Sequence, residues 1–186
     1  KAIAPMGERI LVHTSNFRKV KRTKDVVLIF DKILKKVPAK LLMVGDGPDR
    51  VNCEQLCREL GICEHVRFLG KQEAVEEILS VSDLFMMPSE SESFGLAALE
   101  AMACKVPVIS SNTGGLPELS INGVTGFMSN VGDVEDMAAN AVYILEDDNR
   151  LNQFKENALN RAKEFDLSLI LPQYVNYYLE VIGSKS

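Results

Sequence analysis

Two glutamates flank the beginning of an apolar, alanine-rich run in "SESFGLAALEAMA", residues 91–103. Glu92 precedes the run and Glu100 lies inside it. If the run is a helix, its rise of about 1.5 Å per residue separates the two carboxylates by up to roughly 12 Å. A hydrolytic carboxylate pair requires about 5–9.5 Å, so the spacing predicts two separate contacts with one extended ligand. Without further support, such glutamates are more often a loop acid and a helix residue that both face water.

A helix over residues 94–104 would supply an anion site between the two carboxylates. We expect the amides of Phe94, Gly95 and Leu96 in its first turn, where backbone N–H groups have no helical acceptor and the helix dipole favours negative charge. Gly95 has no side chain and therefore lets an anion approach closely. A ligand with phosphates in the middle and hydroxyl groups at both ends, such as a nucleotide-diphosphate sugar, fits this layout.

A second segment, "SNFRKVKRTK", concentrates positive charge. Five of the 21 basic residues of the chain lie in it, namely Arg18, Lys19, Lys21, Arg22 and Lys24. The chain as a whole carries 26 acidic residues, a net charge of −5 and only 6% aromatic residues, which argues against nucleic acid as a partner. A charge run that only faces water is as common as a binding site, but among functional interpretations a phosphate clamp is favoured.

Motifs for metals and for other nucleotide sites are missing. "VGDGPDR", residues 44–50, has neither the G-x-G-x-x-G fingerprint nor the phosphate loop, and its glycines and proline are equally typical of a turn. No D-x-D pair is present to place a metal on a pyrophosphate. His13 and His65 lie far apart, and the four cysteines contain no C-x-x-C pair. We therefore predict no metal site, and free cysteines in a reducing cytosol.

Alternating elements must position these residues. Short buried strands are expected at residues 9–15, 40–47, 65–70, 83–89 and 106–111, and helices at 23–36, 49–60, 73–81 and 94–104. This alternation predicts an α/β fold with a doubly wound, Rossmann-like parallel sheet that is covered on both faces. Ligands bind outside the carboxyl ends of such strands, which is where the loop with Glu92 falls.

Length and composition predict one globular domain. The chain has 186 residues, of which 46% are apolar, and no apolar run approaches the roughly 18 residues needed to span a membrane. Beyond Gly126 only helices are expected, over residues 132–148, 149–165 and 168–182. The chain opens on Lys1 and not on methionine, which favours a segment of a longer protein.

The motifs together resemble the family-4 retaining glycosyltransferases of the GT-B fold. "ESFGLAALEAMA" is similar to the E-x7-E motif of that family, and the segments "SNFRKVKR", "VGDGPDR", "VRFLGKQ", "SDLFMMPSE", "KVPVISSNTGGLPEL" and "NGVTGFMSNVGD" lie where the family has counterparts. The resemblance implies that residues 1–186 are the C-terminal, nucleotide-sugar-binding domain and that the N-terminal acceptor domain is absent from this chain. Asn16 replaces an arginine found in many members, and the malate-using branch shares this asparagine.

The same resemblance implies the donor-binding residues by position. They are Asn16, Lys21, Gly70, Lys71, Ser93, Phe94, Gly95, Leu96 and Glu100. Glu100 would hold the ribose hydroxyls, and the amides of Gly95 and Leu96 would hold the diphosphate. The backbone around Gly70 and Lys71 would contact the edge of uracil.

Catalysis is implied in the same way. Glu92 is the catalytic candidate, beside the hydroxyls of the donor sugar, and Lys21 matches the phosphate-binding lysine of the family. The implied reaction is a retaining, metal-independent transfer of N-acetylglucosamine from UDP-GlcNAc to L-malate in cytoplasmic bacillithiol biosynthesis, with the UDP-sugar as a substrate and no cofactor. Lys105 departs from the glycine that is usual in the family, and we expect this departure to cost local stability.

Other functions remain open. A UDP-sugar-binding module of the same family could serve a different acceptor, such as a lipid or a polysaccharide. A dinucleotide-dependent oxidoreductase fits the fold but lacks the glycine fingerprint. The tail could mediate protein interaction, and a homo-oligomer is a further alternative. However, the helical spacing of Tyr174, Tyr177 and Tyr178 predicts core side chains more often than an interface.

Overall fold

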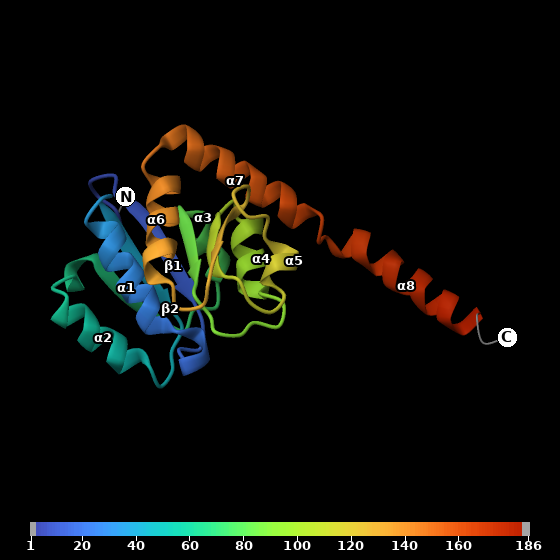
Figure 1. The fold of residues 1–186 in the computed structure, drawn as a ribbon, viewed down its shortest axis with the longest axis horizontal. Coiled ribbons are helices and arrows are strands. Elements are labelled where there is room, and N and C mark those ends of the chain that lie inside the picture. The colour runs from blue at the N-terminus through green and yellow to red at the C-terminus, as the bar shows by residue number, and fades with distance from the viewer. Residues whose placement is uncertain (1–2, 184–186) are drawn as a thin grey trace.

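The computed structural model describes residues 3–183, and its centre is a six-stranded parallel sheet (Figure 1). The strands are β1 (Arg9–Thr14), β2 (Ala39–Val44), β3 (Val66–Gly70), β4 (Leu84–Met87), β5 (Val108–Ser111) and β6 (Gly126–Ser129). Their order across the sheet is β3-β2-β1-β4-β5-β6. The chain therefore winds outward in one direction from β1 and in the other from β4, which confirms the predicted doubly wound fold.

Helices connect the strands. The α-helices are α1 (Thr23–Leu34), α2 (Arg50–Glu59), α3 (Val75–Ser80), α4 (Leu96–Ala103), α5 (Leu116–Leu119), α6 (Val134–Leu145), α7 (Asp148–Lys163) and α8 (Leu167–Gly183), and two 3-10 helices are η1 (Lys19–Lys21) and η2 (Cys63–His65). Side-chain caps mark two helix starts. The carboxylate of Asp133 accepts from the amide of Asp136 at 3.0 Å, and that of Asp147 from the amide of Arg150 at 2.7 Å.

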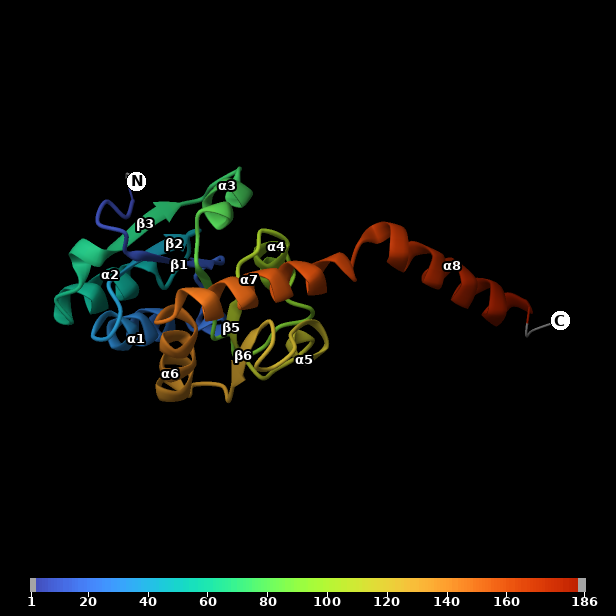
Figure 2. The ribbon, with the colours of Figure 1, turned by 90° about the horizontal axis from the view of Figure 1, so that it is seen from above.

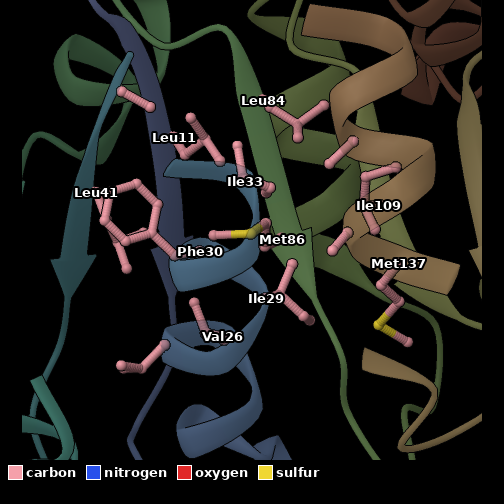
Figure 3. Packing of buried hydrophobic residues seen from close by; sticks show 14 of the residues in the cluster. Leu11, Val26, Ile29, Phe30, Ile33, Leu41, Leu84, Met86, Ile109 and Met137 are labelled. Atoms are coloured by element: carbon pink, nitrogen blue, oxygen red, sulfur yellow. The ribbon is translucent and has the colours of Figure 1, made fainter. Parts of the chain in front are cut away.

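The sheet is buried on both faces, as its near-continuous apolar strands require. Figure 2 shows α1 and α6 on one side of the sheet and α3 and α4 on the other. On the first side, strand residues such as Leu11 and Met86 pack against Phe30 of α1 and Met137 of α6 (Figure 3). Alternate residues of the same strands, such as Val12, pack on the other side with α3, α4 and α5. Helix α7 contributes to both clusters.

One part of the predicted element order is wrong. We expected only helices after Gly126, but Gly126–Ser129 forms β6, which extends the sheet beside β5. The short helix α5 was also not predicted. Both elements have only four residues, so neither shows the repeated apolar spacing on which the sequence-based prediction rests.

Helix α8 projects away from the sheet in both ribbon views (Figures 1 and 2). The prediction that its tyrosines are core residues is wrong, because Tyr174, Tyr177 and Tyr178 are 60–62% exposed. Between residues 3 and 183, no helix combines the length and apolar character needed to cross a membrane.

Candidate functional site

A cavity of about 430 Å³ opens at the carboxyl ends of β1 and β4. These neighbouring strands are the point at which the strand order reverses, and doubly wound sheets bind ligands at such a point. The lining residues come from three segments: His13 and Thr14 at the end of β1 with Ser15, Asn16 and Lys21 after it, Met87 and Ser89 at the end of β4 and just after it, and Glu92, Ser93, Phe94, Gly95, Leu96 and Ala97 before and at the start of α4. The volume lies in the range of small-molecule sites.

Lys21 and Glu92 form an ion pair in this cavity. The Nζ atom of Lys21 donates to both carboxylate oxygens of Glu92, at 2.8 Å to Oε2. The two side chains are only 23% and 10% exposed, so water screens the pair weakly. The structure thus brings together the predicted phosphate-binding lysine and the catalytic candidate, which are 71 residues apart in sequence.

The start of α4 presents free backbone donors beside this pair. Helix α4 begins at Leu96, and the carbonyl of Gly95 accepts from the amides of Ala98 and Leu99 at 2.9 and 3.0 Å. The amides of Gly95, Leu96 and Ala97 have no acceptor within residues 3–183. Together with the helix dipole they form a site for negative charge. The prediction that Phe94 lies in the first turn is wrong, because the helix starts two residues later.

Gly95 is required at this position by its backbone and by its neighbours. Its φ is +91°, in the left-handed region where only glycine is unstrained. A Cβ atom on Gly95 would also lie 2.6 Å from the Cδ2 atom of Leu116. The close packing of α5 against the start of α4 therefore depends on this glycine.

The loop before α5 packs against the backbone of Glu92. The amide of Gly115 donates to the carbonyl oxygen of Glu92 at 3.2 Å, and a Cβ atom on Gly114 would lie 1.6 Å from the same oxygen. A larger residue at Gly114 would therefore displace the backbone that carries the carboxylate. This loop has no predicted role in the sequence analysis, although the adjacent glycines in "NTGGLPEL" are a signal of close backbone packing.

The "VGDGPDR" loop has a similar supporting role. A Cβ atom on Gly45 would lie 1.8 Å from the carbonyl oxygen of Ser15, and one on Gly47 would lie 2.1 Å from that of Asn16. Neither glycine lines the cavity. These glycines allow the loop after β2 to pack closely against the loop after β1. The loop after β1 carries Asn16, which lines the cavity.

His13 and Ser15 are functional candidates that the sequence-based reasoning missed. The Nδ1 atom of His13 lies 2.8 Å from the carbonyl oxygen of Met86, and its Nε2 atom lies 2.8 Å from Oγ of Ser15. The same hydroxyl accepts from the amide of Phe17 at 3.2 Å. Burial lowers the pKa of His13 to about 4, so the ring is neutral near pH 7.

Other predicted donor contacts lie outside the cavity. Glu100 is exposed on α4, while Gly70 and Lys71 lie at the carboxyl end of β3. The carbonyl of Gly70 accepts from the amide of Gly45 at 2.8 Å, which ties the end of β3 to the loop after β2. The basic run does not form a continuous phosphate clamp. Among its five basic residues, only Lys21 lines the cavity.

The cysteines show no sign of a disulfide or metal site. All four are free, with Cys53 and Cys57 buried on α2. Burial raises the pKa of Cys57 to about 12, so its thiol stays protonated and packs as an apolar group. Within residues 3–183, no three His, Cys, Asp or Glu side chains gather in a way that could hold a metal ion.

Sequence comparison finds relatives of this chain among curated proteins. The N-acetyl-alpha-D-glucosaminyl L-malate synthase of Bacillus anthracis is 47% identical over 95% of this chain and 46% of its own length. A D-inositol 3-phosphate glycosyltransferase of Corynebacterium aurimucosum is 28% identical over 96% of this chain and 45% of its own length. The chain therefore spans about half the length of the curated relatives that it matches.

Solved structures show the same fold. The crystal structure of Anabaena Alr3699/HepE in complex with UDP superposes with a TM-score of 0.86, at 27% identity, over 96% of this chain and 50% of that one. The sucrose-phosphate synthase of Thermosynechococcus elongatus superposes with a TM-score of 0.85, at 28% identity, over 97% of this chain and 47% of that one. The model of the family "Glycosyl transferases group 1" matches residues 1–161. The chain belongs to the group 1 glycosyl transferases, and its sheet is a Rossmann-like domain of the GT-B type.

Proposed function

We propose that this chain is the donor-binding half of a cytoplasmic, retaining glycosyltransferase of bacillithiol biosynthesis, which transfers N-acetylglucosamine from UDP-GlcNAc to L-malate. The observation that carries the proposal is the cavity at the point where the strand order reverses, with Lys21, Glu92 and the free amides of α4 facing one space. The 47% identity to the Bacillus anthracis synthase supports the choice of sugar and acceptor.

In this proposal the diphosphate binds at the start of α4. The amides of Gly95 and Leu96 donate to its oxygens, and Lys21 adds a full positive charge. These groups stabilise the negative charge that develops on UDP as it leaves, so the reaction proceeds without a metal or cofactor. Glu92 accepts from hydroxyl groups of the donor sugar beside the reacting carbon. The acceptor then enters on the face from which UDP departs.

The nucleoside binds beyond the cavity. Glu100 lies one helical turn after Leu96 on α4 and is exposed, so its contact with the ribose requires the nucleoside to extend out of the cavity along the helix. Gly70 and Lys71 lie at the same carboxyl edge of the sheet and would contact uracil through their backbone. Asn16, Ser93 and Phe94 line the cavity and complete the donor site.

We propose that the acceptor binds through a second domain, in the part of the relatives' length that this chain does not match. The chain matches about half of its relatives' length, and we propose that without the second domain it binds the donor but transfers no sugar. A titration with UDP, ADP, UDP-GlcNAc and NAD, read by melting temperature, tests the donor. We expect UDP and UDP-GlcNAc to bind, and preferential binding of NAD would overturn the proposal.

Two further measurements sharpen this test. Glu100→Gln should weaken the binding of UDP and of uridine to the same extent, because the lost contact is with the ribose that both ligands contain. Incubation of the chain with UDP-GlcNAc and L-malate should give no product above a control without protein. Turnover by the purified chain would show that it contains a complete acceptor site.

A further inference from the structure

His13 and Ser15 form a hydrogen-bonded pair at the end of β1, and both line the cavity. His13 is 1% exposed, and its ring lies 6.0 Å from that of Phe17. Its two ring nitrogens contact two different groups, a carbonyl oxygen on β4 and the Ser15 hydroxyl. The pair thus joins the two strands between which the cavity opens.

The proton positions in this pair follow from the partners. A carbonyl oxygen can only accept, so Nδ1 of His13 must carry the proton that is donated to Met86. A neutral imidazole has one N–H group, which leaves Nε2 with a lone pair. The hydroxyl of Ser15 therefore donates its single proton to Nε2 of His13. The lowered pKa of His13 agrees with a neutral ring.

The Ser15 oxygen then has no proton left for a ligand. One of its two lone pairs accepts from the amide of Phe17 at 3.2 Å. The second lone pair remains for the cavity that Ser15 lines. We propose that Ser15 accepts a hydrogen bond from a hydroxyl group of the bound sugar, and that His13 is a positioning residue that holds Ser15 in this acceptor state.

This assignment divides the cavity by polarity, and it rests on the proposed function. Phosphate oxygens are acceptors, so the lone pair of Ser15 repels them, whereas Lys21 and the amides of Gly95 and Leu96 attract them. A sugar hydroxyl is a donor and is favoured next to Ser15 and the Glu92 carboxylate. The pair therefore selects the orientation in which the sugar, and not the diphosphate, lies against the end of β1.

The proton assignment can be measured without any ligand. The chain has two histidines, so His65→Gln leaves only His13 in a long-range ¹H–¹⁵N spectrum of the imidazole rings. We expect a neutral ring at pH 7 with the proton on Nδ1. A proton on Nε2, or on both nitrogens, would overturn the proposal because Ser15 would then keep its own proton for the ligand.

The ligand assignment is measured by the affinities for UDP and UDP-GlcNAc. Ser15→Ala should lower the affinity for UDP-GlcNAc by about threefold to tenfold, the range for one hydrogen bond. The affinity for UDP should stay unchanged. Ser80→Ala, on an exposed serine of α3, is the matched control and should change neither. Equal weakening of both ligands would mean that Ser15 only shapes the loop, and no change for either would mean that it does not contact the sugar.

Two substitutions at His13 separate positioning from folding. His13→Asn can still donate to Met86 but has no acceptor in the place of Nε2. It should therefore weaken the binding of UDP-GlcNAc and leave the binding of UDP unchanged. His13→Gln can offer an acceptor near Ser15 and should restore most of the UDP-GlcNAc affinity. If His13→Asn bound UDP-GlcNAc more tightly than His13→Gln does, the positioning role of His13 would be refuted. If the wild-type chain binds UDP but no UDP-sugar, the proposed function fails, whereas the spectrum still decides the proton assignment.

Discussion

The ion pair between Lys21 and Glu92 should couple stability to the binding site. Lys21→Met removes the positive charge but keeps an apolar side chain of similar length, and Glu92→Gln removes the negative charge. Each single substitution leaves one charge in a cavity where Glu92 is only 10% exposed. The double variant leaves neither. We therefore expect the two single substitutions to cost more, in sum, than the double substitution costs.

The magnitude follows from distance and exposure. At 2.8 Å and an effective dielectric constant of about 20, the direct attraction is about 6 kcal/mol. Loss of water from both ions offsets most of this attraction. Exposed pairs have couplings of about 0–1 kcal/mol, and breaking a buried pair costs about 3–5 kcal/mol. For this partly buried pair we expect a coupling free energy of about 1–3 kcal/mol.

The assay is urea unfolding of the wild-type chain, both single variants and the double variant at low salt. Urea is uncharged and does not screen the pair, whereas guanidinium would. The Lys105–Glu156 pair is the matched control, with its Nζ and Oε1 atoms 2.7 Å apart and both side chains at least half exposed. Its cycle should give a coupling near zero. Additive effects at Lys21 and Glu92, within about 0.5 kcal/mol, would refute the reasoning.

Four further outcomes are expected. Lys21→Met should weaken the binding of UDP by about tenfold to a hundredfold and the binding of uridine hardly at all. Glu92→Gln should strengthen the binding of UDP, because it frees Lys21 from its ion pair. Calorimetry that shows equal effects on the binding of uridine would contradict both predictions. Lys105 has a φ of +63°, so Lys105→Gly should be about 0.5–1 kcal/mol more stable in urea than Lys105→Ala, which lacks the same ion pair. Because the pKa of His13 is about 4 in the folded chain and 6.5 unfolded, the unfolded state binds the extra proton between these values. The free energy of unfolding should therefore fall by up to about 3 kcal/mol as the pH drops from 6.5 to 4, and this part of the pH dependence should be absent in His13→Asn.

The resemblance and the local patterns predicted the fold and part of the site. Strands and helices follow from the spacing of apolar residues, which a short window of sequence contains. The free amides at the start of α4 also follow from the local sequence, because every helix leaves its first N–H groups unpaired. The missed β6 shows the limit, since four residues are too few for such a pattern.

The contacts that make the site were decided only by the tertiary structure. Lys21 meets Glu92, and His13 meets Met86, because β1 and β4 are neighbours in the sheet, although about 70 residues separate the partners in sequence. Local patterns do not specify which strands are adjacent, so they could not show that the lysine and the glutamate neutralise each other. The same limit applies to the tyrosines of α8. Their helical spacing is local, but whether a helix face is covered depends on what packs against it, and here α8 extends away from the sheet.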